Sequence, residues 1–271
     1  MDRIIRANEF YCCKFIKSLT LSYGLTEIGK YAFYYCSNLE TVIIPETVTK
    51  IDHDAFEYSG LKSIILSDGL TEIGDFTFYG CDNLETVVIP ETVTKIGHDA
   101  FACSALESIN LPHGLTEIRE DAFHGCRNLE SVVIPEAVTK IGPYVFAFSG
   151  LKSITLPHGL TEIGEGAFYK CRNLETLIIP ETVTKIGPCA FEGSGLKSII
   201  LPDGRLTEIK EDTFNNCQKL ETIVIPETVS KIGPGAFAYS GLRTIILPDG
   251  LTEIGEDAFL NCNNLVVEYR N

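Results

Sequence analysis

The sequence predicts a solenoid, mostly β in content, in which short parallel strands stack along one axis. Two observations predict this fold. A unit of 22 or 23 residues recurs along the chain, and each unit carries a short β-branched run that ends at a turn residue. The length of 271 residues would alone suggest one or two globular domains, but division by the repeat gives about twelve coils in a single domain, residues 1–271.

A phenylalanine that we expect to point inward marks each unit. Successive members of this series lie 22 or 23 residues apart, and two kinds of unit alternate to give a double repeat of 45 residues. A unit this short cannot bury its apolar face alone, so neighbouring units must stack around a shared core. The members are Phe33, Phe56, Phe78, Phe101, Phe123, Phe146, Phe168, Phe191, Phe214, Phe237 and Phe259.

Each strand is predicted from the pattern Leu-x-x-Val-x-Ile, in which Leu39, Val42 and Ile44 should point inward. A proline follows most of these runs and ends the strand after about four residues, because proline cannot donate a ladder hydrogen bond. A short extended piece such as residues 48–51 comes next. A Gly-x-x-Ala-Phe segment then predicts a single helical turn, since Pro143 in one such segment suits the first turn of a helix.

The two ends depart from the regular unit. Residues 1–23 form a degenerate first coil, because residues 16–21 match the strand pattern of residues 61–66. Residues 264–271 predict a terminal strand whose outer edge is open. An open strand edge pairs readily with another chain, so a homo-oligomer is one expectation.

Composition and charge exclude several classes of function. Hydrophobic residues make up 45% of the chain, which is enough for a continuous core. Acidic residues outnumber basic ones by 37 to 22, and the net charge of −15 has the wrong sign for a nucleic-acid partner. No apolar run approaches the ~20 residues of a spanning helix, and residues 1–6 open no secretory segment, so we expect no membrane insertion.

The unit Leu-x-x-Val-x-Ile-Pro-x-x-Val-x-x-Ile-Gly-x-x-Ala-Phe-x-x-Cys resembles that of the BspA-like leucine-rich-repeat family, over roughly residues 5–265. The resemblance implies an α/β-type leucine-rich-repeat solenoid. This is a right-handed superhelix with a long parallel sheet on its concave side and short extended segments and single helical turns on its convex side. It also implies a cell-surface protein that binds extracellular-matrix proteins or neighbouring cells.

The spacing of the ten cysteines argues against a disulfide framework. Six of them recur every second coil, about 9.6 Å apart, whereas a disulfide needs Cα atoms within about 7 Å; these are Cys36, Cys81, Cys126, Cys171, Cys217 and Cys262. We expect them to be buried free thiols. Cys13 lies one coil from Cys36, so a bridge is geometrically allowed there, and the redox state of Cys12, Cys13, Cys103 and Cys189 stays open.

Two signals predict opposite locations. The lack of a signal peptide, of Asn-x-Ser/Thr sequons and of paired cysteines favours the cytoplasm, whereas the family resemblance favours the cell surface.

No motif predicts an enzyme. The sequence contains no nucleophile elbow, phosphate-binding loop or dinucleotide motif. Its five histidines and ten cysteines form no cluster with the spacing of metal ligands. We therefore expect no catalytic residue, no cofactor and no bound metal.

The outward positions of the strands form two columns on the predicted sheet. One column is hydroxylic. The other, which we call the stripe, is mostly aliphatic: Ile43, Ile65, Val88, Asn110, Val133, Thr155, Ile178, Ile200, Val224 and Ile246. Branched residues suit any strand, but a contiguous exposed apolar stripe is typical of an interaction surface. We predict that the stripe binds a protein partner or a second copy of the chain.

Two charged columns complete the pattern. One alternates Glu and Lys from coil to coil, as in Glu27 and Lys50, and should pair neighbouring coils while penalising a slip of register. The second stops alternating at Glu85, Glu107 and Glu130. These three carboxylates suit a solvated edge, and they also suit a basic partner or a cation.

The sequence thus predicts a non-catalytic protein–protein interaction module. Adhesion, or binding of host or matrix proteins at a cell surface through the concave face, is the first interpretation. The alternative is an intracellular scaffold or a self-associating structural protein.

Overall fold

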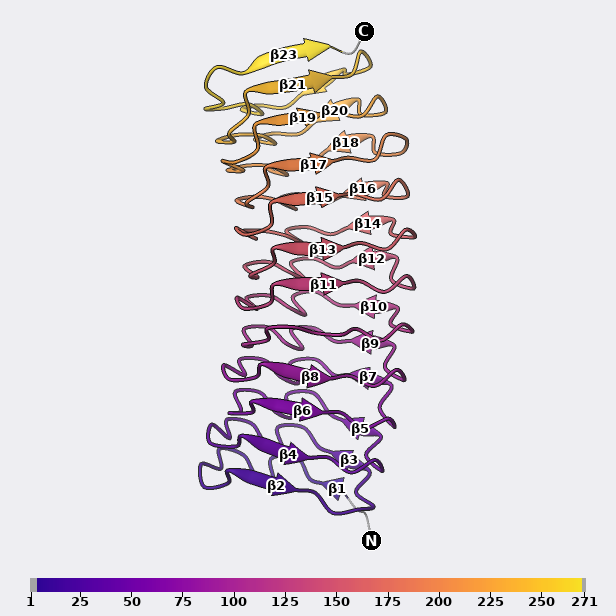
Figure 1. Cartoon of the computed structure of the whole chain (residues 1–271), viewed down its shortest axis with the longest axis vertical. Helices are drawn as coiled ribbons and strands as arrows, with labels where there is room; N and C mark the ends of the chain where they lie inside the picture. The colour runs from indigo at the N-terminus through magenta and orange to yellow at the C-terminus, as the bar shows by residue number, and fades with distance from the viewer. Residues whose placement is uncertain (1–3, 270–271) are drawn as a thin grey trace.

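The computed structural model describes residues 4–269, which form a solenoid of about twelve coils. The coils stack along the longest axis of the molecule, and the two termini lie at opposite ends of the stack (Figure 1). The described residues contain 23 strands and no helix. Neighbouring strands are parallel, as in Ser131↔Ser153 and Lys140↔Glu162, so the predicted parallel solenoid is confirmed.

Each regular coil contributes one longer and one shorter strand. The longer strands form the long-strand face: β2 (Ser18–Thr20), β4 (Thr41–Ile43), β6 (Ser63–Ile65), β8 (Thr86–Val88), β11 (Ser131–Val133), β13 (Ser153–Thr155), β15 (Thr176–Ile178), β17 (Ser198–Ile200), β19 (Thr222–Val224), β21 (Thr244–Leu247) and β23 (Val266–Tyr269). The shorter strands form the short-strand face: β1 (Ile4–Ile5), β3 (Glu27–Ile28), β5 (Lys50–Ile51), β7 (Glu72–Ile73), β9 (Lys95–Ile96), β10 (Glu117–Ile118), β12 (Lys140–Ile141), β14 (Glu162–Ile163), β16 (Lys185–Ile186), β18 (Glu208–Ile209), β20 (Lys231–Ile232) and β22 (Glu253–Ile254).

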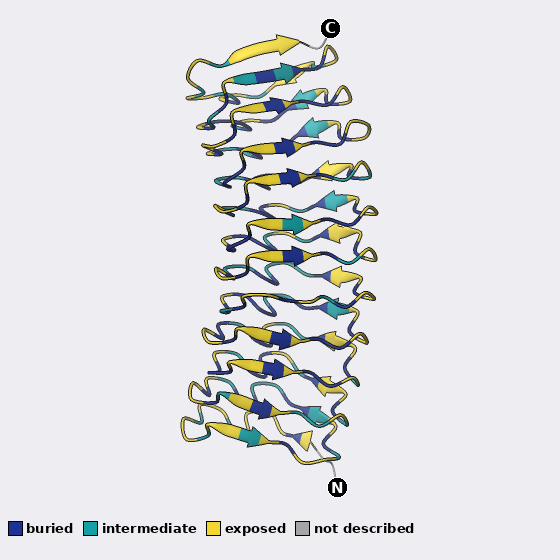
Figure 2. Ribbon diagram, in the orientation of Figure 1, coloured by how far each residue is buried: buried dark blue, intermediate teal, exposed yellow. Residues whose placement is uncertain are grey.

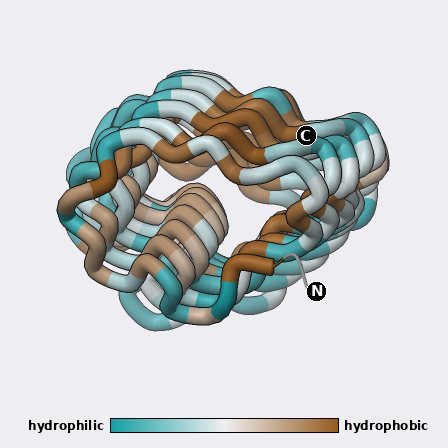
Figure 3. Tube along the Cα trace, turned by 90° about the horizontal axis from the view of Figure 1, so that it is seen from below, coloured by the Kyte–Doolittle hydropathy of each residue, from teal (hydrophilic) through white to brown (hydrophobic). Residues whose placement is uncertain are grey.

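A column of phenylalanine rings runs through the core. Adjacent rings are stacked with centroids 5.1 to 5.8 Å apart, from Phe10 to Phe259, and their planes lie within 12° of each other. Rings from Phe33 to Phe237 have no exposed surface. Seen from the end, the hydrophobic segments of successive coils lie over one another (Figure 3). The predicted inward phenylalanine series is therefore confirmed.

The predicted single helical turn is wrong. In the segment that follows β3, the N–H of Ala32 donates to the carbonyl of Gly29 and closes a tight turn. The next N–H, that of Phe33, donates to the carbonyl of Ala55 in the following coil, at 2.7 Å. Tyr31 has a φ of 56°, which a right-handed helix excludes. The Phe33 N–H thus donates to the neighbouring coil, whereas in a helix it would donate to a carbonyl of its own segment.

The long-strand face is divided into ladders. Within the described residues, β2 pairs with β4, β6 with β8, β11 with β13 and β15 with β17, while β19, β21 and β23 form one ladder. Residues 108–110 adopt no strand, and Asn110 stands there in place of a β-branched residue. Asparagine disfavours strands because its side chain competes for backbone hydrogen bonds. The coil that carries Asn110 therefore separates the ladders on its two sides.

Candidate functional site

The structure places the stripe on the outside of the long-strand face. On these strands buried and exposed residues alternate, as the colours in Figure 2 show. Seven aliphatic members are 42 to 69% exposed, and Asn110 and Thr155 are exposed as well. Ile246 is half-buried. The side chains stand in register, as in Ile65↔Val88 and Ile178↔Ile200.

Polar members divide the stripe into two apolar halves. The first half holds Ile43, Ile65 and Val88, and the second holds Ile178, Ile200 and Val224. Asn110 and Thr155 lie between the halves on either side of Val133.

Each half is hollowed where two neighbouring strands share no ladder. A depression of about 450 Å³ lies over β4 and β6, and one of about 360 Å³ lies over β17 and β19. Shallow apolar depressions with polar rims are suited to receiving single side chains of a partner.

Polar groups border the stripe on both sides. The hydroxyl column lies two residues before it on the same face, and Thr41, Ser63 and Ser198 from that column line the depressions. On the other side, carboxylates follow the strands: Glu46 and Asp68 line the first depression, and Glu181 and Asp203 the second. The surface therefore presents an apolar strip between hydroxyl groups and an acidic border.

The second predicted site, the acidic triplet, is brought together only in part. Glu85, Glu107 and Glu130 are exposed, and the N–H of Glu107 donates to the carbonyl of Glu85 at 3.1 Å, which places them in adjacent coils. Glu130 pairs with Lys152 at 2.5 Å, which neutralises one end. The described residues include no group of three His, Cys, Asp or Glu side chains that could hold a metal ion. The interpretation of this triplet as a solvated edge, or as a site for a basic partner or a cation, stays a prediction.

The alternating charged column lies on the short-strand face and pairs in register. Glu27 is opposite Lys50, with Oε1 2.6 Å from Nζ. Glu162 contacts both neighbours, Lys140 at 3.2 Å and Lys185. These contacts confirm the predicted coil-to-coil pairing.

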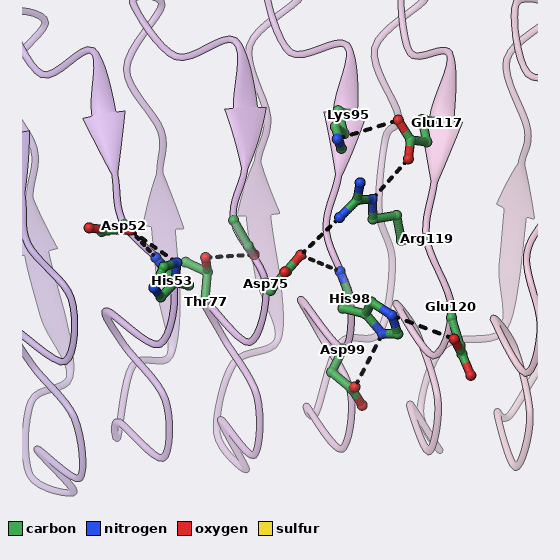
Figure 4. A network of polar contacts seen from close by, with 11 residues as sticks. Asp52, His53, Asp75, Thr77, Lys95, His98, Asp99, Glu117, Arg119 and Glu120 are labelled. Atoms are coloured by element: carbon green, nitrogen blue, oxygen red, sulfur yellow. Dashed lines mark hydrogen bonds and ion pairs between the residues drawn. The ribbon is translucent and has the colours of Figure 1, made fainter.

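A polar network extends this column across the three coils of β7, β9 and β10 (Figure 4). Arg119 joins Glu117, at 2.8 Å, to Asp75, at 3.8 Å. His98 lies 3.5 Å from Glu120 and 3.8 Å from Asp99, and burial raises the pKa of Asp99 to about 6. These contacts link side chains of neighbouring coils, so the network joins the coils to one another.

The cysteine column forms the predicted stack of buried thiols at Cys36, Cys81, Cys126, Cys171 and Cys217, whereas the sixth member, Cys262, is half-buried. All ten cysteines are free. Cys126 donates to the carbonyl of Phe101 at 3.1 Å and contacts Ser104 at 3.4 Å. Burial raises the pKa of Cys126 to about 12, so this thiol is not a nucleophile at neutral pH. Cys12 and Cys103 are exposed, whereas Cys13 and Cys189 are half-buried.

Sequence reasoning missed two features. The depressions escaped it because they arise where ladders are interrupted, which no single unit reveals. It also missed a group of tyrosines in the turns of the first coils, such as Tyr11, Tyr31 and Tyr34, which come together only when the coils stack.

Residues 4–269 contain no helix that is long and apolar enough to cross a membrane.

Comparisons with known proteins agree with this architecture. A crystal structure of a leucine-rich repeat protein from Bacteroides ovatus is similar, with 28% identity and a TM-score of 0.77 over 96% of this chain and 80% of that one. A leucine-rich cell surface protein from Faecalibacterium prausnitzii is also 28% identical, with a TM-score of 0.62 over 98% of this chain and 77% of that one. The pneumococcal vaccine antigen PcpA shares the fold at 19% identity, with a TM-score of 0.58 over 94% and 69% of the two chains.

No curated protein matches the sequence. The family model for the BspA-type leucine-rich repeat region matches six copies, over residues 3–130 and 139–266. Because this match covers most of the sequence, the chain belongs to the BspA-type leucine-rich repeat family.

Proposed function

We propose that the protein is a non-catalytic interaction module that binds a protein partner through the long-strand face. Leucine-rich repeat proteins are typically protein-interaction modules. The observation that carries the proposal is the stripe, whose seven aliphatic side chains are 42 to 69% exposed among the described residues. Exposed apolar surface that extends over many coils is costly in water and is typical of docking faces.

The borders of the stripe define the chemistry of the partner. Hydroxyl groups on one side offer hydrogen bonds, and carboxylates on the other side, such as Asp68 and Glu181, favour basic groups. A complementary partner presents apolar side chains flanked by lysine or arginine. The similar Faecalibacterium protein is named a cell surface protein, and a location like that one would bring matrix or cell-surface proteins within reach as partners. Self-association is the second candidate, because the exposed stripe can also pack against a second copy of the chain.

Binding to purified collagen, fibronectin and laminin by biolayer interferometry tests the first candidate, and sedimentation velocity tests the second. The informative variant replaces Ile178, Ile200 and Val224 by Thr, because Thr20 and Thr155 already occupy this column and threonine keeps the branched shape. We expect about a ten-fold loss of affinity, or of self-association, with unchanged melting. Association that the triple variant leaves intact would refute the proposal.

A further inference from the structure

A further cavity, separate from the two depressions of the stripe, lies in the turns that connect the short strands to the long strands of the first four coils. Its volume is about 570 Å³. Its lining combines aromatic rings with two carboxylates: Asn8, Tyr11, Tyr31, Tyr34, Asp54, Glu57 and Phe76. This combination occurs nowhere in the stripe and takes no part in the proposed docking of a partner there.

The rings present their faces in two directions. Tyr34 stacks on Tyr11 with centroids 4.9 Å apart and an interplanar angle of 11°. Tyr31 meets Tyr34 edge-on at 5.5 Å and 90°. Tyr31 and Phe76 have φ values of 56° and 55°, in the column of the repeat where Asn8 occurs one coil earlier. A bulky residue is disfavoured in this left-handed conformation, whereas Asn is readily accommodated, so these rings are held there against local backbone preference.

The cavity lining holds two carboxyl groups and lies beside one lysine. Asp54 is buried and Glu57 is half-buried. Burial, and then a hydrogen bond with Asp54, raises the pKa of Glu57 to about 7. Lys30 pairs with Asp54, with Nζ 3.6 Å from Oδ2, and its charge also acts on Glu57. Among residues 4–269, Glu57 has no ion-pair partner.

The position of Lys30 shows which ligand this surface accommodates. Its ammonium lies 4.6 Å from the centroid of the Tyr31 ring and beside Asp54 at the same time. An ammonium over an aromatic face is attracted by the ring quadrupole, and a neighbouring carboxylate adds to the attraction. A hard metal ion prefers several oxygen ligands, and the described residues form no such set.

We propose that this cavity binds an alkylammonium group, which packs against the rings of Tyr11, Tyr31 and Tyr34 and lies beside the carboxyl group of Glu57. The group is carried either by a lysine side chain of a peptide or by a free quaternary ammonium compound. Lys30 occupies the neighbouring position and partly competes for the same charge.

Saturation-transfer NMR tests the proposal with two probes, N-acetyl-lysine methylamide and tetramethylammonium chloride, each against sodium chloride at equal ionic strength. We expect transfer from the aromatic protons of the protein to at least one probe, with affinity of about the millimolar range. Transfer to the lysine probe alone assigns a peptide source, and transfer to tetramethylammonium assigns a quaternary head group. No transfer to either probe at about 100 mM overturns the proposal.

Matched variants identify the site. Glu57→Gln and Tyr11→Leu should each weaken binding by about five-fold, and Lys30→Ala should strengthen it. Glu192→Gln is the control for charge, because Glu192 has the same place in the repeat, three residues after Cys189 where Glu57 follows Asp54. Tyr239→Leu is the control for an exposed ring outside the cavity. Circular dichroism melts verify folding, and binding that Glu57→Gln and Tyr11→Leu leave unchanged would overturn the assignment.

Discussion

The long-strand and short-strand faces are built from the same coils but expose different kinds of side chain to solvent. On the short-strand face, the outward column alternates Glu and Lys, and Glu162 bridges two lysines. On the long-strand face, the outward column is aliphatic, and Ile178 stands beside Ile200 in water. Both columns have the same register and parallel pairing. The difference shows that an outward strand position of this fold accepts charged side chains, which is why we propose that the exposed isoleucines contact a partner.

The largest expected effect comes from comparing two neighbours on β15. Leu177 is 4% exposed and Ile178 is 68% exposed. Leu177→Ala should lower the free energy of unfolding by about 2–5 kcal/mol, because it leaves a cavity in the core. Ile178→Thr should change it by less than about 0.5 kcal/mol. Urea denaturation measures both, and similar losses for the two variants would show that the stripe is part of the core.

The next largest effect is expected when two stripe residues are replaced by a charged pair like those of the short-strand face. Ile178→Lys combined with Ile200→Glu places opposite charges on directly paired positions, as on the short-strand face. The new pair should contribute about 0.2–1 kcal/mol, so the protein stays folded. Association through the stripe should fall at least about ten-fold, since burying these charges against a partner carries a desolvation penalty. A folded double variant that associates like the wild type contradicts the account.

The charged column itself should contribute little to stability. Glu162→Gln removes two ion pairs at once, and we expect a loss of about 0.2–1 kcal/mol at low salt. The loss should shrink at about 1 M salt because exposed charges are screened. Thermal melts at both salt concentrations measure it. A salt-independent loss above about 2 kcal/mol would mean that the column stabilises the coils by packing as well as by charge.

The ion pairs of Glu162 also predict a small pH dependence of the free energy of unfolding. Hydrogen bonding to Lys185, and further interaction with Lys140, lowers the pKa of Glu162 below its ordinary value. The stabilising effect is therefore fully present above the unfolded-state pKa and is lost as the pH falls through the lower folded-state pKa. The difference in unfolding free energy between wild type and Glu162→Gln should shrink between about pH 5 and about pH 3. A difference that grows on acidification would contradict this sign.

Periodicity made most of the fold and the stripe predictable. A repeat that recurs in phase states which side chains stack, so the phenylalanine column and the exposure of Ile43 follow from their positions alone. The turns were not predictable in the same way, because the destination of the Phe33 N–H is a carbonyl in the next coil. The tyrosine cavity depends on variable residues from four coils, which a consensus unit averages away.

The most direct test of the central claim compares the two faces in one assay. One variant carries Ile178→Thr, Ile200→Thr and Val224→Thr on the long-strand face, and the other carries Lys140→Gln, Lys185→Gln and Lys231→Gln on the short-strand face. Their dissociation constants for the matrix proteins, and for self-association, are measured beside the wild type. The account predicts a loss of about ten-fold for the stripe variant and almost none for the lysine variant. Equal affinities for wild type and stripe variant, or a larger loss from the lysine variant, would contradict it.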